Sequence, residues 1–292
     1  MSTEVNKAFV QQFKDNLIHL AQQKGSKLAS TVKKEMVTGK SAHFERLGAT
    51  AAVQRTSRHG DTPLIDTPHS RRRVTLLDYE WADLIDHQDK VRMLIDPQSD
   101  YALAGARALG RKLDDIIIGA LEGNASSIDS SDSASSVALV HTIDEDFNTA
   151  NSDIIMEKVV EAKRILMSNE VDTDMEELYF VLDSTALHNL LKETEVSSAD
   201  YNTVKSLVAG SPGTFMGFNF IQSERLTTTS ESFKRCLAYA KSGAVLAMGQ
   251  DITARISERD DKSYATQVYA SMTAGATRLE EEKVIAVEAY RT

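Results

Sequence analysis

The sequence predicts an α+β fold, and three observations lead to this prediction. Helical periodicity runs without a break from Pro97 to Glu122. Helical and strand patterns alternate between Asn151 and Gly249, and the alternating apolar residues typical of antiparallel strands follow from 250 to 292. The 292 residues, of which 41% are hydrophobic and 26% charged, can form the core of a soluble globular protein with two subdomains.

The stretch from Pro97 to Glu122 is predicted to be the helix around which the other elements are organised. Proline is tolerated in the first turn of a helix, and Gly123 with Asn124 gives a stop signal. Its 26 residues would form a helix about 39 Å long. One face carries an apolar stripe, and small residues elsewhere would let another backbone approach closely. The stripe is Ala102, Ala106, Leu109, Leu113, Ile116, Ile117 and Ala120, and the small residues are Ala104, Gly105, Ala108 and Gly110.

Charge is distributed unevenly along the chain, whose net charge is -10. The first 73 residues hold 13 basic and 6 acidic side chains, whereas the remainder holds 20 basic and 37 acidic ones. Such a basic segment suits contact with nucleic acid or with the acidic body of another copy. We favour another copy, because no aromatic side chains are interleaved for base stacking. An amphipathic helix expected from Glu4 to Gln23 would pack on its own core or dock on a neighbour.

A long hairpin is predicted between Phe44 and Trp81. Its strands are expected at 51–56 and 74–81, on either side of a polar segment with a turn signal at Gly60. Because an isolated two-stranded ribbon is only marginally stable in water, the hairpin should lie either on its own domain or on an adjacent subunit. Three consecutive arginines, Arg71, Arg72 and Arg73, are candidate partners for acidic groups there.

The rest of the chain reads as a serine-rich segment, a mixed α/β region and terminal strands. Residues 126–136 are expected to be a flexible loop by composition. A helix is expected to open at Asn151-Ser152-Asp153. A short helix should follow Asp183 or Ser184, and a further helix should run through Val204 and Leu207. Strands are expected at 178–182, 217–222, 234–240, 252–256, 264–272 and 283–290, with a turn at 259–262 and a structural glycine, Gly275, that permits a bend or bulge.

No stretch of the sequence indicates an active site, a cofactor or a metal. The seven histidines are scattered, and no HxxxH or HExxH spacing, phosphate loop, GxSxG or GxGxxG occurs. The single cysteine, Cys236, rules out an internal disulfide and a thiolate metal cluster, and is expected to be a buried, inert thiol. No apolar run is long enough to predict a membrane span. These absences favour a structural protein.

The order of these elements resembles the major capsid proteins of tailed bacteriophages, of the Hong Kong 97-type fold. The segments RRRVTLLDYEWADLIDHQDKVRMLIDPQSDYALAGARALGRKLDDIIIGAL (71–121) and ITARISERDDKSYATQVYASMTAGATRLEEEKVIAVEAY (252–290) look like podovirus-type capsid sequences. The resemblance implies an N-terminal arm (1–43), an extended hairpin loop (44–81), a peripheral domain (82–150) with its spine helix (97–122), an axial domain (151–249) and a return to the peripheral domain (250–292).

The resemblance also implies a function. Copies would assemble as hexamers and pentamers into an icosahedral shell in the bacterial host cytoplasm, with a separate scaffolding protein and a portal. The shell, or virion capsid, would enclose double-stranded DNA without sequence-specific binding. Some relatives cross-link a lysine in the extended loop, but residues 51–81 contain no lysine, so we expect no such bond. Candidate subunit-interface residues are Arg55, Arg58, Arg71, Arg72, Arg73, Tyr79, Trp81, Arg107 and Arg111.

Three alternatives stay open at this point. An encapsulin-like compartment shares the fold and would hold enzyme cargo instead of a genome. A soluble enzyme would need a pocket with convergent polar groups, and a nucleic-acid-binding module would show salt-dependent affinity for DNA.

Overall fold

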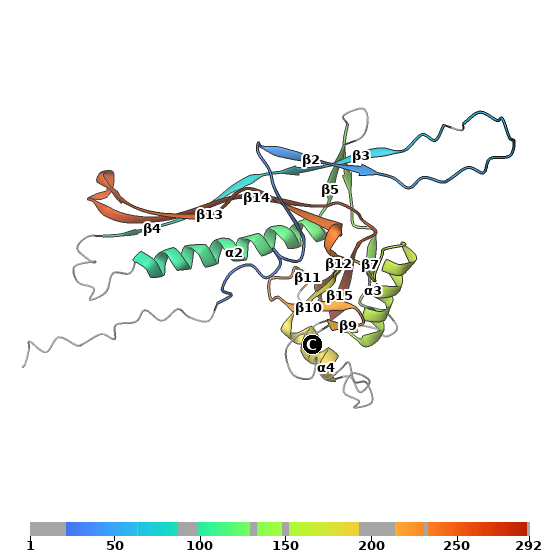
Figure 1. Cartoon of the computed structure of the whole chain (residues 1–292). Coiled ribbons are helices and arrows are strands. Elements are labelled where there is room, and N and C mark those ends of the chain that lie inside the picture. The colour runs from blue at the N-terminus through green and yellow to red at the C-terminus, as the bar shows by residue number, and fades with distance from the viewer. Residues whose placement is uncertain are drawn as a thin grey trace, which may run out of the picture. The chain divides into compact units, whose positions relative to one another are not determined.

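The computed structural model describes residues 22–62, 64–86, 98–128, 133–147, 152–192, 214–230 and 233–290 (Figure 1). Within these ranges the chain forms three sheets and three α-helices. The helices expected at 4–23 and through 204–207 lie outside the described residues. The α-helices are α2 (Gln98–Glu122), α3 (Met156–Ser168) and α4 (Ser184–Lys192).

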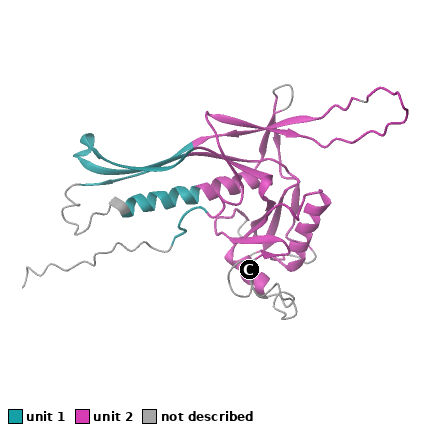
Figure 2. Cartoon of the chain, in the orientation of Figure 1, with its two compact units in different colours: residues 1–26, 78–112, 250–272 teal, residues 27–77, 113–249, 273–292 magenta. Residues whose placement is uncertain are grey.

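The described chain divides into two compact units, which Figure 2 colours separately. Unit 1 takes in residues 22–26, 78–112 and 250–272, and unit 2 takes in the described parts of 27–77, 113–249 and 273–290. Helix α2 and strands β4 (Leu77–Ile85), β13 (Ala244–Arg259) and β14 (Ala265–Arg278) each contribute residues to both units.

The largest sheet has seven strands and forms most of the core of unit 2. Its order is β7-β15-β12-β8-β10-β9, with β11 paired to β12. Apolar runs such as Cys236–Ala240 and Val284–Val287 are buried throughout, as expected of strands covered on both faces. Helix α3 packs against β7 and β15. The strands are β7 (His141–Ile143), β8 (Leu178–Leu182), β9 (Thr214–Phe215), β10 (Phe218–Gln222), β11 (Thr228–Ser230), β12 (Phe233–Ala240) and β15 (Val284–Tyr290).

Helix α3 starts later than the sequence pattern indicates. Its buried residues Val159, Ala162 and Leu166 have helical spacing, as predicted. The opening expected at 151–153 is wrong for its described residues, Ser152 and Asp153, which precede the helix. The Ser152 hydroxyl donates to the Glu145 carbonyl at 2.7 Å instead of capping the helix. The helix begins at Met156 with no side-chain cap.

A second sheet, ordered β2-β3-β5-β6, contains the predicted hairpin. Strands β2 (Ser41–Leu47) and β3 (His69–Thr75) pair antiparallel, from Ser41 opposite Thr75 to Leu47 opposite His69. The strand expected at 51–56 is wrong, since no strand occurs in the described part of 48–68. The strand expected at 74–81 is interrupted at Leu76, whose N–H donates to the Lys40 carbonyl, so that β3 and β4 join different sheets.

The serine-rich segment is also ordered differently from the prediction. Strands β5 (Ala125–Ile128) and β6 (Ala134–Val137) pair antiparallel, and β5 pairs with β3. Serine is a poor strand former, but the exposed side chains of β6 need no apolar partner, and the backbone supplies the ladder hydrogen bonds. Composition alone therefore gave the wrong answer for this segment.

The third sheet has the order β1-β13-β14-β4, where β1 is Lys33–Met36. The turn between β13 and β14 is a short 3-10 helix, η3 (Asp260–Lys262), followed by Ser263 and Tyr264 at positive φ. This matches the predicted turn at 259–262. Strand β14 was expected to end at 272, with a bend or bulge at Gly275, but it continues through Gly275 to Arg278. The glycine is structural for another reason, because a side chain there would collide with the Thr75 carbonyl.

Helix α2 agrees with the prediction to within one residue at its start. Its predicted close approach is confirmed at Gly110, where an added Cβ would lie 2.8 Å from the Gly25 Cα. The stop differs, because Gly123 is not in the left-handed region. Instead, the buried guanidinium of Arg278 donates from Nη1 to the Leu121 and Gly123 carbonyls at 2.8 and 2.9 Å.

Candidate functional site

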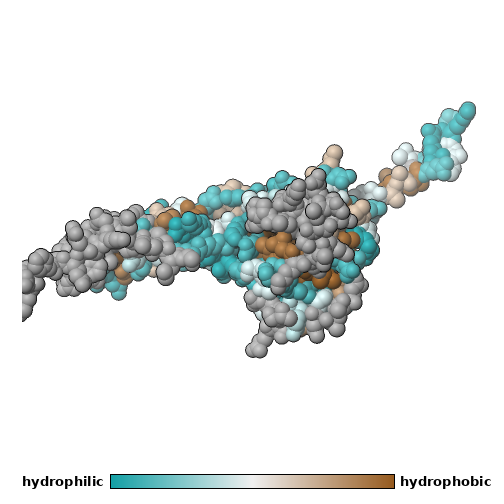
Figure 3. Space-filling model, turned by 90° about the horizontal axis from the view of Figure 1, so that it is seen from below, coloured by the Kyte–Doolittle hydropathy of each residue, from teal (hydrophilic) through white to brown (hydrophobic). Residues whose placement is uncertain are grey.

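The loop between β2 and β3, residues 48–68, exposes apolar side chains to solvent. Leu64 is 99% exposed and Val53 is 59% exposed, and Ile65 is exposed as well. The loop projects away from the strands that carry it (Figure 1). Figure 3 shows the same segment at the right, with hydrophobic residues among hydrophilic ones. Single exposed apolar residues occur on most protein surfaces, but three on one projecting segment suit contact with a partner.

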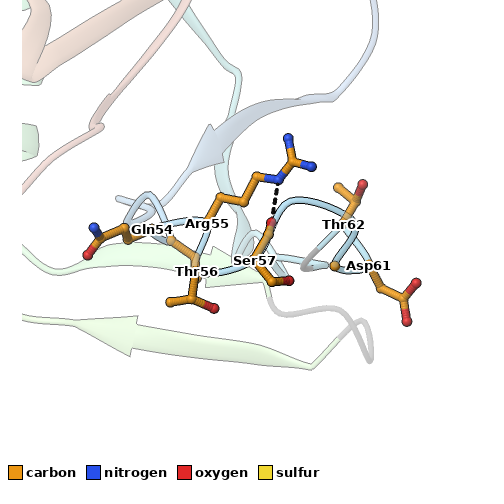
Figure 4. A pocket seen from close by; sticks show the side chains of 8 residues that line it. Gln54, Arg55, Thr56, Ser57, Asp61 and Thr62 are labelled. Atoms are coloured by element: carbon orange, nitrogen blue, oxygen red, sulfur yellow. Dashed lines mark hydrogen bonds between the residues drawn. The ribbon is translucent and has the colours of Figure 1, made fainter.

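The tip of this loop folds back on itself around a small polar pocket (Figure 4). The Arg55 Nε donates to the Ser57 carbonyl at 2.8 Å. The Arg55 guanidinium and the Asp61 carboxylate point in different directions. The pocket therefore lacks the convergent charged groups that an active site needs. Both predicted interface residues in the loop, Arg55 and Arg58, are exposed. The lining is Val53, Gln54, Arg55, Thr56, Ser57, Gly60, Asp61 and Thr62.

The three consecutive arginines of β3 do not share one face. Strand alternation leaves Arg71 and Arg73 exposed, and Arg71 Nη2 lies 3.3 Å from Glu45 Oε1 on β2. Arg72 points the opposite way and is only 2% exposed. The prediction that Arg72 reaches a neighbouring subunit is therefore corrected, because its side chain is enclosed within its own chain.

Arg72 belongs to a buried ionic cluster at the base of the hairpin. Its Nη2 donates to Glu281 Oε1 at 2.5 Å, and Arg46 Nη1 on β2 lies 3.5 Å from Glu281 Oε2. The Nε of Arg278 lies 3.7 Å from the same carboxylate. Burial is the largest influence on both buried arginines and lowers the pKa of Arg72 and of Arg278. Three guanidinium groups thus converge on one carboxylate.

The sequence reasoning missed three of the four members of this cluster, namely Arg46, Arg278 and Glu281. Arg278 follows an apolar strand pattern, and Glu281 lies in the run Leu279–Lys283, which reads as an exposed acidic turn. A charged residue at the end of a buried strand was the available signal, because such groups are rarely buried unless paired.

The predicted interface residues of unit 1 lie on β4 and α2. The Lys112 Nζ lies 5.4 Å from the centroid of the Tyr79 ring, and burial raises the pKa of Tyr79. The Trp81 ring occupies the space that a side chain at Gly105 would need. Arg111 Nη1 donates to Gln22 Oε1 at 2.8 Å. Arg107 is half-buried on the same helix.

The opposite face of β4 is acidic and exposed. Because Tyr79 and Trp81 face α2, alternation places Asp78, Glu80 and Leu84 on the other side of the strand. All three are exposed, and β4 is an edge strand of its sheet. This face has the sign of charge that suits a basic partner.

No catalytic arrangement emerges elsewhere in the part of the chain that the structure describes. Among those residues, no group of three or more His, Cys, Asp and Glu side chains could hold a metal ion. Burial raises the pKa of the Cys236 thiol, as an inert core cysteine requires. None of the described helices is long and apolar enough to span a membrane.

Comparisons with known proteins agree with the fold. Residues 5–290 match the family model described as phage capsid protein. The capsid of cyanophage P-SCSP1u has a TM-score of 0.72 at 16% identity, covering 100% of this chain and 96% of that chain. The capsid structure of the Helicobacter pylori bacteriophage KHP30 has a TM-score of 0.72 at 10% identity, with 99% and 98% covered.

A third structure, the capsid of Ralstonia phage GP4, has a TM-score of 0.69 at 12% identity and covers 98% of this chain and 96% of that chain. A search of curated proteins found no match. These likenesses confirm the predicted α+β fold of the Hong Kong 97 type.

Proposed function

Because the chain belongs to the phage capsid protein family, we propose that its copies assemble as hexamers and pentamers into the icosahedral shell of a tailed phage. The protein is a structural capsid protein. The proposed shell encloses double-stranded DNA without reading its sequence, and forms in the host cytoplasm with a separate scaffolding protein and a portal. We propose that the chain needs no catalytic activity for this role.

The observation that carries this proposal is the exposed loop 48–68. Leu64, Ile65 and Val53 are left in water by their own chain. Covering such groups on a neighbour releases roughly 25 cal/mol per Å² of apolar surface. Every copy carries the same loop, so closure of a shell would multiply a modest gain per contact.

Opposite charges on the hairpin and on β4 suggest which surface of a neighbouring copy the hairpin contacts. The exposed arginines of the hairpin and loop are Arg55, Arg58, Arg71 and Arg73. The outer face of β4 offers the acidic residues Asp78 and Glu80 on an exposed strand. We propose that the hairpin and loop of one copy contact this part of the next. Opposite charges would speed correct encounters more than they add affinity.

The domain roles follow from the same proposal. Residues 151–249 would meet their copies around fivefold and sixfold axes, and 82–150 with 250–292 would form the peripheral part. The acidic balance of residues 74–292 would keep the shell from trapping the DNA that enters it.

A charged substitution in the loop tests the proposal. Leu64→Asp should leave the chain folded and reduce the yield of shells at least tenfold on co-expression with the scaffolding protein, measured by sedimentation and negative-stain microscopy. Val140→Asp is the matched control, because Val140 is 66% exposed and lies outside both the loop and residues 151–249. Normal shell yield from Leu64→Asp would contradict the proposed role of the loop.

The absence of lysine in residues 51–81 gives a second test. Mature particles boiled in denaturant should run as a single monomer band on a gel. A ladder of covalent multimers would show that the chain is cross-linked through other residues.

A further inference from the structure

The Glu281 cluster connects the base of the hairpin to two other parts of unit 2. Arg46 and Arg72 belong to the two hairpin strands, whereas Arg278 and Glu281 belong to the end of β14 and the segment after it. Arg278 donates from Nη2 to the Val137 carbonyl of β6 at 3.0 Å and from Nη1 to the carbonyls of Leu121 in α2 and Gly123 just after it. Glu281 is therefore the link between the hairpin and a buried arginine fixed to α2 and β6.

Apolar packing gives the hairpin base little support of its own. The buried cluster under it consists of Val74, Leu76 and Ala247, with Val37, Ala42 and Phe44 packed at its edge. The seven-stranded sheet, in contrast, buries whole runs of residues. Besides this small cluster, the hairpin base is held by the β3–β5 ladder on one side and by the ion pairs of Glu281 beside it.

We propose that Glu281 is a positioning residue for shell assembly, which fixes the direction of the hairpin by holding Arg46 and Arg72 against the anchored Arg278. This inference rests on the proposed function. Without the Glu281 charge, guanidinium groups from β2, β3 and β14 face one another with no carboxylate between them. Breaking one side of a buried ion pair leaves uncompensated charge, which the structure relieves by moving the most weakly held element.

The length of the loop makes a small change at the base large at the tip. About ten residues separate Leu47 from the tip, which at full extension is roughly 35 Å. A tilt of about 10° at the base would move the tip by roughly 6 Å, twice the length of a hydrogen bond. A loop displaced by that distance would miss the surface it must cover on a neighbour.

Amide hydrogen exchange on the unassembled full-length chain tests the first half of the inference. Glu281→Gln keeps the size of the side chain and removes its charge. We expect exchange in β2 and β3 to rise at least tenfold, while exchange in β12 and β15 stays unchanged. Glu45→Gln is the matched control, because Glu45 pairs with Arg71 on the same strands at the surface, with exposed fractions of 72% and 55%. The control should match the wild type.

Co-expression with the scaffolding protein tests the second half. Glu281→Gln should give aberrant or open particles. Asp261→Asn, which removes the exposed ion pair with Arg259 outside the hairpin, should give closed shells like the wild type. The inference is overturned if Glu281→Gln leaves amide exchange in β2 and β3 unchanged. It is also overturned if exchange in these strands rises but the variant still forms normal shells. If the wild type never assembles, the proposed function is wrong, and Glu281 can have no role in assembly. The exchange experiment would still show whether Glu281 holds the hairpin in place.

A milder variant covers the case in which Glu281→Gln does not fold. Arg46→Gln removes only the cluster member whose side chain is 25% exposed. Exchange in β2 and β3 is then expected to rise about threefold, with fewer closed shells. Wild-type exchange in this variant, combined with global unfolding of Glu281→Gln, would mean that Glu281 stabilises the whole chain and does not position the hairpin.

Discussion

The seven-stranded sheet and the β2–β3 hairpin differ in how much of their side-chain surface is covered by their own chain. In the sheet, apolar runs on β8, β12 and β15 are covered by their own chain. In the hairpin, one face of each strand and most of the 48–68 loop stay in water. One region is complete in a single copy, and the other has surface left for a neighbour. Because the two differ in this way, stability and assembly should respond to different substitutions.

The largest effect on stability is expected in the sheet. Phe180 is fully buried, with its ring centroid 5.3 Å from Phe220 and 5.8 Å from Phe218. Phe180→Ala should lower the free energy of unfolding by about 3–5 kcal/mol, because it removes packing and leaves a cavity. Denaturant titration followed by circular dichroism measures this. A loss below about 1 kcal/mol would mean that the sheet is not the stable part of the chain.

The next largest effect on stability should distinguish Arg72 from its neighbours Arg71 and Arg73 on β3. Arg72→Glu places a second carboxylate beside buried Glu281 and should cost about 3 kcal/mol or more. The double substitution Arg71→Glu with Arg73→Glu changes exposed groups only, so the unfolding free energy should move by less than about 1 kcal/mol while shell yield falls. Denaturant titration and sedimentation of the two variants test whether buried and exposed arginines alternate along β3. Equal stability losses would contradict it.

A smaller effect on stability is expected in the loop. Leu64→Ser with Ile65→Ser should change the free energy of unfolding by less than about 0.5 kcal/mol, since neither side chain is buried in the single chain. Shell yield should nevertheless fall severalfold. Clear destabilisation of the unassembled chain would indicate that the loop packs on its own body.

A further effect on the sheet appears only at high pH. Burial, together with a hydrogen bond to Glu177, raises the pKa of Tyr179 to about 12 from its ordinary value of 10.0. A pKa raised by folding adds stability that is complete below pH 10 and is lost as the pH rises through 12. Tyr179→Phe should therefore weaken the decline in unfolding free energy between these values. An identical decline in the variant would rule out Tyr179 as its cause.

The sequence predicted well the elements that are determined by a local pattern of apolar residues. Helix α2 carries its apolar stripe from Ala102 to Ala120, and Leu178–Leu182 is an unbroken apolar run, so both were placed almost to the residue. The elements predicted wrongly depend on partners distant in sequence. Strand β5 exists because β3 pairs with it, and this pairing is invisible in the composition of a serine-rich segment.

The same distinction applies to the candidate site. Exposure of Arg58 could be predicted from its polar segment, whereas Arg55 was expected in a strand that does not form. The alternation of Arg71 and Arg73 could be read from the sequence once the strand was known. The burial of Arg72 could not be, because it requires Glu281, which lies 209 residues away in the chain. Short-range patterns predict faces of strands, whereas a buried charge is explained only by its partner.

The central claim is that the hairpin and its loop are surfaces completed by other copies. The most direct measurement is sedimentation velocity with negative-stain microscopy on the wild-type chain, expressed alone and with its scaffolding protein. We predict hexamers and pentamers, or closed shells, in at least the co-expressed sample. A uniform monomer or dimer under both conditions would contradict the claim.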